Sequence, residues 1–283
     1  MYYKSIQNKI NADYITAARI KNPLEGFNFE SIEISRNNGD LEDCNLSYST
    51  FSNVRIEAIS MANCNLNFST FQDCFLEHVD LSQSEFIKTC IEKCSLIDVT
   101  LVGSFVGTKI DNTNFQNVAL VNSEQVGVQY LKNTFGNCNL NGIRFIASKL
   151  NNCIVFESKL QNTDLIKSRF QKASFESCDL RDARFQNMFL TNTKIIDCSF
   201  KNTLIKDSQL LNVKFHKSNF KESIFMNTKF DNVDFAFAQF NGAAFINCSF
   251  TTSCNLKNLK IVKECYFDQR SIKALGDSYR YFK

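Results

Sequence analysis

The side chains of this sequence with the most chemistry to offer are its twelve cysteines. A cysteine can act as a nucleophile, a metal ligand or a disulfide partner, and the first two roles need a neighbouring base or further ligands. No Cys-x-x-Cys pair occurs, and the two histidines, His78 and His216, are far apart. No phosphate-binding loop, dinucleotide fingerprint or nucleophile-elbow motif is present. We therefore predict no enzyme activity, no metal site and no cofactor.

Most of the cysteines occupy one position of a regular pattern, two residues before a large apolar residue. These are Cys44, Cys64, Cys74, Cys94, Cys138, Cys153, Cys178, Cys198, Cys248 and Cys254. The same position elsewhere holds small or β-branched residues, so we expect these cysteines to be buried as small hydrophobes. Cys90 and Cys265 lie one residue outside the pattern and are predicted to be more exposed. Free thiols favour a reducing, cytoplasmic compartment.

The pattern itself has a period of five residues. Every fifth residue from Phe170 to Phe250 is large and apolar, and the same spacing begins at Leu41. Neither a helix nor an ordinary strand has this period, so the repeat must define an architecture. The large residue, which we call the centre, and the residue two before it point inward, as in a short strand. The two residues after the centre must turn the chain, and Asn, which tolerates left-handed backbone angles, is frequent in the second of them.

The spacing is interrupted at a few places. Arg36 to Gly39 breaks it after two early centres, Phe29 and Ile34, and the step from Leu101 to Phe105 is one residue short. Gln125 is a polar centre. After Phe250 one residue is inserted, and we expect Leu256, Ile261 and Tyr266 to continue the series.

Four five-residue units close a square coil of twenty residues, and stacked coils pair through their backbones. About twelve coils then form a solenoid roughly 58 Å long at a strand spacing of about 4.8 Å, with ladders of Phe along its axis. The fold class is therefore all-β.

Individual units carry a family resemblance. They include Cys44-Asn45-Leu46, Thr163-Asp164-Leu165, Cys178-Asp179-Leu180 and Val233-Asp234-Phe235. Such units resemble the A-(D/N)-(L/F)-x-x signature of pentapeptide-repeat proteins, and the resemblance covers residues 27–267. It implies a right-handed quadrilateral β-helix. The last two positions of the unit depart from the family consensus, but they face outward.

Segments outside the repeat are predicted to cap it. Residues 1–26 carry apolar residues at helical spacing, which predicts an N-terminal helical cap. Residues 268–283 form a C-terminal helical cap or dimerisation segment, on the spacing of Ile272, Leu275, Tyr279 and Phe282. No stretch is apolar enough to span a membrane, and the N-terminus does not have the form of a signal peptide.

Outward residues twenty apart stack on one side of the rod, and one side is notably apolar. Its candidate partner-binding stripe consists of Ile87, Val106, Val126, Ile146, Ile166, Met226 and Ile246. A contiguous apolar stripe is explained by a binding surface, by a homodimer seam, or by stacked β-branched residues that favour the sheet. A second side carries scattered cations, Lys109, Lys132, Lys149, Arg169, Lys172 and Lys229, too sparse for us to expect direct nucleic-acid binding.

These features favour a non-enzymatic scaffold that presents flat faces to a protein partner, and a homodimer. Two alternatives stay open. The family resemblance implies a DNA-imitating protein that binds topoisomerase (gyrase), although those members are strongly acidic and this chain carries a net charge of +3. The chain could also be a bacterial effector that is secreted into a host cell.

Overall fold

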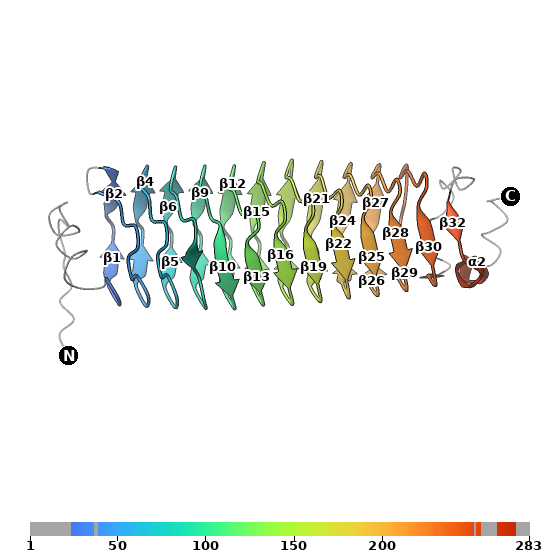
Figure 1. The fold of residues 1–283 in the computed structure, drawn as a ribbon, viewed down its shortest axis with the longest axis horizontal. Helices are drawn as coiled ribbons and strands as arrows, with labels where there is room; N and C mark the ends of the chain where they lie inside the picture. The colour runs from blue at the N-terminus through green and yellow to red at the C-terminus, as the bar shows by residue number, and fades with distance from the viewer. Residues whose placement is uncertain (1–23, 37–38, 252, 256–264, 276–283) are drawn as a thin grey trace.

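The chain forms a straight rod of stacked coils in the computed structural model (Figure 1). The structure describes residues 24–36, 39–251, 253–255 and 265–275. Successive coils pair in parallel, residue on residue, about twenty positions apart, as Ile146 pairs with Ile166. Three sides of the rod are continuous parallel β-sheets and the fourth is a row of single bridging residues. The predicted quadrilateral β-helix is confirmed.

Sheet A forms one side and has twelve strands, one for each coil. In order they are β1 (Asn28–Glu30), β3 (Thr50–Ser52), β5 (Thr70–Gln72), β8 (Cys90–Glu92), β11 (Lys109–Asp111), β14 (Gln129–Leu131), β17 (Lys149–Asn151), β20 (Arg169–Gln171), β23 (Phe189–Thr191), β26 (Gln209–Leu211), β29 (Lys229–Asp231) and β31 (Ser249–Phe250).

Sheet B follows sheet A around the coil and has ten strands. In order they are β2 (Glu33–Ser35), β4 (Arg55–Glu57), β6 (Phe75–Glu77), β9 (Ser95–Ile97), β12 (Asn114–Gln116), β15 (Thr134–Gly136), β18 (Ile154–Phe156), β21 (Ser174–Glu176), β24 (Lys194–Ile196) and β27 (Lys214–His216).

Sheet C also has ten strands and precedes sheet A around the coil. In order they are β7 (Ser84–Glu85), β10 (Gly103–Val106), β13 (Glu124–Val126), β16 (Arg144–Ile146), β19 (Asp164–Ile166), β22 (Arg184–Gln186), β25 (Leu204–Lys206), β28 (Ile224–Met226), β30 (Ala244–Ile246) and β32 (Tyr266–Phe267). The fourth side, between sheets B and C, is a row of bridges such as Asn139 to Lys159 and Lys159 to Asp179.

The centres fill the axis, as the repeat predicts. Toward the C-terminal end Phe200, Phe220 and Phe240 stack one above another, with ring centroids 4.8 and 5.1 Å apart. Phe225 and Phe245 stack at 4.7 Å on the next side. Offset stacking of this kind contributes beyond the burial of apolar area. The Phe ladder is therefore the inside of the rod and is not a binding motif.

The corners of the coil are residues in the left-handed region, two positions after each centre. Asn152 and Asn192 have φ of 53° and 52°, and all the Asn residues expected at this position have positive φ. The amides of most corner residues donate to a carbonyl one coil further on, as Asn152 N does to Gln171 O at 2.9 Å, and those of Asn232 and Asn247 donate to Thr251 Oγ1 and Asp268 Oδ2. These bonds keep the corner backbone satisfied, which offsets the intrinsic cost of left-handed angles.

The two early interruptions of the spacing have a simple structural form. Phe29 pairs with Phe51, so the coil containing Arg36 to Gly39 has two extra residues. At the short step no residue takes the left-handed corner conformation. After Asp98, the next residue with a positive φ is Gly107. Strand β10 runs straight through that place, and both irregularities are confirmed.

One expectation about the C-terminal end is wrong. Tyr266 is 60% exposed and pairs with Ala244, whereas Phe267 pairs with Phe245 and stacks on it at 4.6 Å. The interval from Phe245 to Phe267 shows that two residues are inserted there, so the inward position moves by one. Leu256 and Ile261 lie outside the described residues.

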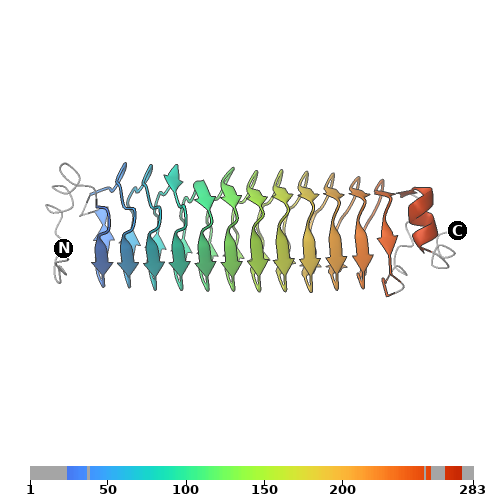
Figure 2. The same cartoon turned by 90° about the horizontal axis from the view of Figure 1, so that it is seen from below.

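A short helix, α2 (Gln269–Leu275), lies across the C-terminal end of the rod (Figure 2). Asp268 caps it, because its Oδ1 accepts a 2.8 Å bond from the amide of Ser271. Ser271 and Leu275 are buried against the last coil. At seven residues, this helix is too short to cross a membrane, and the described residues hold no longer apolar helix. Residues 1–23, with most of the predicted N-terminal cap, lie outside the described part of the chain.

Candidate protein-binding surface

The cysteines are positioned as packing residues. The nine cysteines at the repeat position from Cys44 to Cys248 are buried, and Cys254 is half-buried. Desolvation raises the pKa of the Cys64 and Cys138 thiols to about 12, so they are protonated at neutral pH. Cys90 is half-buried outside the row, and its partial burial and the neighbouring Glu92 raise its pKa. An activated thiol needs the opposite shift. Hydrogen bonds from Cys94 and Cys198 do lower the pKa of Cys74 and Cys178, but both thiols are buried in the core and have no access to a substrate.

Other polar side chains pair locally across the surface. His216 Nε2 lies 2.8 Å from Asp234 Oδ2, and His78 lies 3.7 Å from Asp98. Partial burial raises the pKa of Asp179, but bonds from Arg181 and Gln161 outweigh it and hold that pKa below its usual range. Among the described residues no group of three or more His, Cys, Asp or Glu side chains could hold a metal ion.

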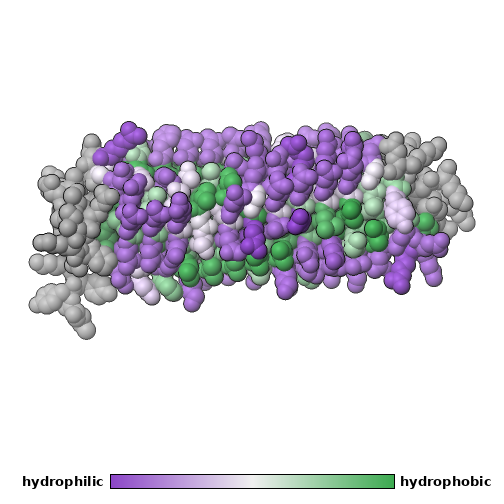
Figure 3. Space-filling view, viewed as in Figure 1, coloured by the Kyte–Doolittle hydropathy of each residue, from purple (hydrophilic) through white to green (hydrophobic). Residues whose placement is uncertain are grey.

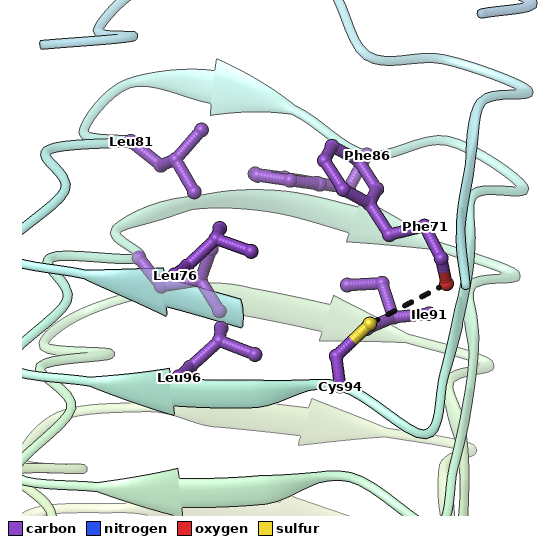
Figure 4. A pocket seen from close by; sticks show the side chains of 8 residues that line it. Phe71, Leu76, Leu81, Phe86, Ile91, Cys94 and Leu96 are labelled. Atoms are coloured by element: carbon purple, nitrogen blue, oxygen red, sulfur yellow. Dashed lines mark hydrogen bonds between the residues drawn. The ribbon is translucent and has the colours of Figure 1, made fainter. Parts of the chain in front are cut away.

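A small cavity lies inside the N-terminal half of the rod (Figure 4). Leu76, Leu81, Leu96 and Leu101 line it where later coils have Phe more often, and Cys94 Sγ donates to the carbonyl of Phe71 at 3.5 Å. The side chains around it are apolar and offer no group that could orient a ligand. It is best explained as a packing gap left by Leu in place of a stacked ring.

The candidate stripe is brought together by sheet C. Its members stand at the outward position just after each centre, in parallel register: Val106 with Val126, Val126 with Ile146, and Ile146 with Ile166. Met226 and Ile246 continue the same row beyond Gln186 and Lys206. Val106 is 37% exposed and the other members are half-buried. Figure 3 shows hydrophobic side chains as interrupted bands that run along the rod between hydrophilic rows.

The candidate dimerisation residues are only partly described. Leu275 is 5% exposed because it packs on its own chain, while Ile272 is half-buried on α2. Tyr279 and Phe282 lie outside the described residues. A dimer contact through this end therefore stays a prediction.

Exposed aromatic residues at the corners were missed by the sequence analysis. Tyr48 and Phe68 occupy successive left-handed corners beside sheet C and stack at 4.9 Å with an interplanar angle of 2°. Phe237 is an exposed corner residue on another edge. The signal was available, because an aromatic two residues after a centre must point outward.

Acidic residues do not form a long row on any side. Within the described strands, acidic side chains in register continue for two coils at most, as in Glu57 with Glu77 and Asp111 with Glu92. Arg55 also pairs with both Glu57 and Glu77. Imitation of DNA would need a continuous row of negative charge.

The sequence comparisons agree with this architecture. The family model described as a pentapeptide repeat region matches residues 128–210, and the model described as pentapeptide repeats matches residues 59–97 and 214–251. Together the matches cover more than half of the sequence, and the chain therefore belongs to the pentapeptide repeat family. No curated protein matches it in sequence.

Several solved structures resemble the rod. HetL, a pentapeptide repeat protein involved in heterocyst differentiation regulation in Nostoc sp. strain PCC 7120, is 16% identical, with 88% of this chain and 96% of HetL covered and a TM-score of 0.44. QnrB1, a plasmid-mediated fluoroquinolone resistance protein, is 12% identical, with 89% and 98% covered and a TM-score of 0.30. The catalytic domain of a GH87 α-1,3-glucanase is 10% identical, with 95% and 66% covered and a TM-score of 0.43. These likenesses concern the fold alone.

Proposed function

We propose that the protein is a non-enzymatic scaffold whose sheet C binds another protein through the apolar stripe. The observation that carries the proposal is the row of aliphatic side chains from Ile87 to Ile166, aligned coil upon coil on an open sheet face. Scattered single hydrophobic residues are normal on a surface, but a contiguous row is typical of an interaction site. Backbone groups of neighbouring coils pair along this row, as the amide of Gly107 does with the carbonyl of Val126 at 2.8 Å, and the amide of Ile87 donates to Oδ1 of Asn67. The stripe therefore offers mainly side-chain contacts.

The setting of the stripe supports binding more than catalysis. The described sides of the rod are sheets and bridged rows, and no cleft near the stripe gathers titratable groups. The free, buried cysteines fit a reducing compartment, and we propose the cytoplasm as the place of action.

Paired substitutions test the proposal. Ile146→Asp with Ile166→Asp places two charges on the stripe without touching the core, and a matched control, Ile97→Asp with Ile196→Asp, does the same at the equivalent position of sheet B. A photo-crosslinking side chain at Val126 in the full chain should capture a defined protein, which is then purified and its affinity measured. We expect at least about a tenfold loss of affinity in the stripe variant and none in the control.

Light scattering on the same samples separates a partner from a second copy. If the stripe variant changes the mass of the particle and no other protein is captured, the stripe is a homodimer seam. Equal affinities for stripe variant and control would reject the proposal.

A further inference from the structure

The corner between sheet C and sheet A carries unbalanced positive charge beside the stripe. Residues 87–90, 106–109, 126–129, 146–149 and 166–169 contain five cations and no Asp or Glu. The cations are Lys88, Lys109, Lys149, Lys167 and Arg169, all exposed. None of them makes an ion pair with a described residue.

The acids that border this area are occupied, flanked by arginine or set back. Asp164 is the flanked one, because it lies in register between Arg144 and Arg184. Glu124 pairs with Arg144 at 3.0 Å, and Glu85 accepts a 2.9 Å bond from the amide of Asn67. Glu92 and Asp111 lie on the far side of the sheet A centres. The corner therefore faces solvent as a cationic row parallel to the apolar stripe.

The corner itself is bare over three consecutive coils, at Gly107, Gly127 and Ala147. Packing does not demand this: a Cβ at Gly127 would meet no atom within 4 Å, and one at Gly107 would meet only Lys88 Cγ at 3.6 Å. The left-handed backbone does not demand it either, since Lys88 and Lys167 adopt the same angles at the same corner. The missing side chains open a path between the stripe and the cations.

An exposed aromatic residue bounds the area at each end. Phe68 is 41% exposed and Lys88 Nζ lies 5.5 Å from its ring centroid. Phe189 is 41% exposed and the guanidinium of Arg169 lies 5.2 Å from its ring centroid. Cation–π contacts of this kind are modest at exposed sites, but the rings extend the apolar surface beyond the stripe. We call the whole area, from Phe68 to Phe189, the corner patch.

The spacing of side chains along the corner patch favours one secondary structure in a bound partner. Coils repeat at about 4.8 Å, whereas residues on one face of an extended strand laid along the rod repeat at about 6.7 Å. An α-helix laid along the rod presents one set of side chains per turn, about every 5.4 Å. Over the three coil steps from Val106 to Ile166 the helix drifts from the stripe by only about 2 Å, so consecutive helical turns can meet the stripe residues in succession.

We propose that the corner patch binds an acidic amphipathic α-helix of a partner protein, laid along the rod with its apolar side on the stripe and its carboxylates toward Lys109, Lys149 and Arg169. The inference rests on the proposed function and names the chemistry of the partner. A nucleic acid would use the cations but has no use for an aliphatic row. A lipid surface would require apolar side chains that protrude, and those of the stripe are mostly half-buried.

The test uses the full chain and a defined probe. The probe is a fluorescent, end-capped helical peptide of about fourteen residues with Leu on one side and Glu on the flanks. Two control peptides replace Glu by Lys or place Pro in the middle, which breaks the helix. We expect only the acidic helical peptide to bind, with an affinity that falls as salt rises from about 0.05 to about 0.5 M.

Variants locate the binding. Lys109→Glu with Lys149→Glu should weaken it about tenfold or more, and Gly127→Asn with Ala147→Asn should weaken it by refilling the corner with a residue that these turns accept elsewhere. Lys194→Glu with Lys214→Glu, an exposed cation pair in register on sheet B, should have no effect.

The outcomes distinguish this inference from the proposed function. Equal binding of the acidic and basic peptides, both lost in Ile146→Asp with Ile166→Asp, overturns the acidic partner and leaves stripe binding in place. Binding of the acidic peptide that is weakened by Lys109→Glu with Lys149→Glu but unchanged by Ile146→Asp with Ile166→Asp contradicts both the acidic-helix inference and the proposed function. Tighter binding of a duplex DNA of about thirty base pairs, lost on reversing Lys109 and Lys149, overturns the helix in favour of a nucleic acid. If the acidic peptide does not bind the full chain, the inference of an acidic helical partner is also overturned.

Discussion

The Oε1 atom of Gln125 accepts a 2.9 Å hydrogen bond from the hydroxyl of Tyr130 inside the apolar axis of the rod. The two residues are consecutive centres on adjoining sides, and both are buried. The ring of Tyr130 meets Phe135 and Phe145 edge-on, which keeps its hydroxyl pointed at Gln125. Gln125 and Tyr130 therefore form a hydrogen-bonded polar pair in the apolar core, and Nε2 of Gln125 makes no hydrogen bond with any described residue.

This pair predicts a marked non-additivity in stability. Tyr130→Phe leaves the buried amide of Gln125 without its bond, which should lower the free energy of unfolding by about 1–3 kcal/mol. Gln125→Leu should lower it by a similar amount, because the hydroxyl of Tyr130 is then unpaired. The double variant replaces both polar groups by apolar ones and should be close to the parent protein. Urea denaturation of the four proteins gives the coupling energy, and strictly additive losses would contradict the pairing.

A second prediction concerns the short step between Leu101 and Phe105. A Cβ at Gly103 would overlap the carbonyl oxygen of Ser84 in the previous coil. The backbone cannot yield without breaking the pairing of β10 with β7, so Gly103→Ala should lower the free energy of unfolding by about 1–3 kcal/mol. Gly127→Asn is the control, because the site is open and Asn tolerates its left-handed angles. Thermal unfolding compares them, and equal melting temperatures would reject the steric explanation.

The register itself predicts which neighbours in the sequence matter. Phe175 is buried in the axis and lies 5.4 Å from the ring of Phe170, whereas Glu176 is exposed on the next position of β21. Phe175→Ala should lower the free energy of unfolding by roughly 3–5 kcal/mol. Glu176→Ala should change it by less than about 0.5 kcal/mol. Chemical denaturation measures both, and comparable losses would show that the inward register is wrong.

Much of this fold follows from the sequence because one position in five is fixed by burial. Phe170 and Phe250 are inward for the same reason, and the stripe from Val106 to Ile166 follows once the coil is closed. The five-residue spacing predicts that Tyr266 points inward, but two residues are inserted between Phe245 and Phe267, and the inward residue is Phe267. The apolar pattern marks one insertion after Phe250 but not the second, because Tyr266 and Phe267 are both large and aromatic and either could be the centre.

Relationships across a corner were harder to foresee than those along a face. In the sequence pattern, Lys109, Lys149 and Arg169 fall on a side separate from the stripe. The coil brings the two together, because only two residues separate them and the outward one of the two is glycine at Gly107 and Gly127. Residues such as Val106 and Lys109, three positions apart in the chain and on different faces, are recognised as neighbours only when the turn geometry is known.

Four of the buried cysteines predict a loss of stability in alkali. Desolvation raises the pKa of Cys153 and Cys248 to about 11 and that of Cys64 and Cys138 to about 12, above the value of about 8.5 for a free thiol. The folded state thus binds these protons more tightly than the unfolded state does. The resulting stability is fully present below about pH 8.5 and is lost as the pH rises toward 11–12.

Each thiol should lower the free energy of unfolding by roughly 1.4 kcal/mol per pH unit within that window. Urea midpoints between about pH 8 and about pH 11 check the slope. Cys64→Ala with Cys153→Ala is the matched variant, because Ala173 and Ala183 fill the same inward position in other coils. Its free energy of unfolding should fall less steeply with pH, because two of the thiols no longer release protons on unfolding. The difference in slope should equal the contribution of two thiols. A variant that keeps the full slope would show that the buried thiols are not the groups responsible.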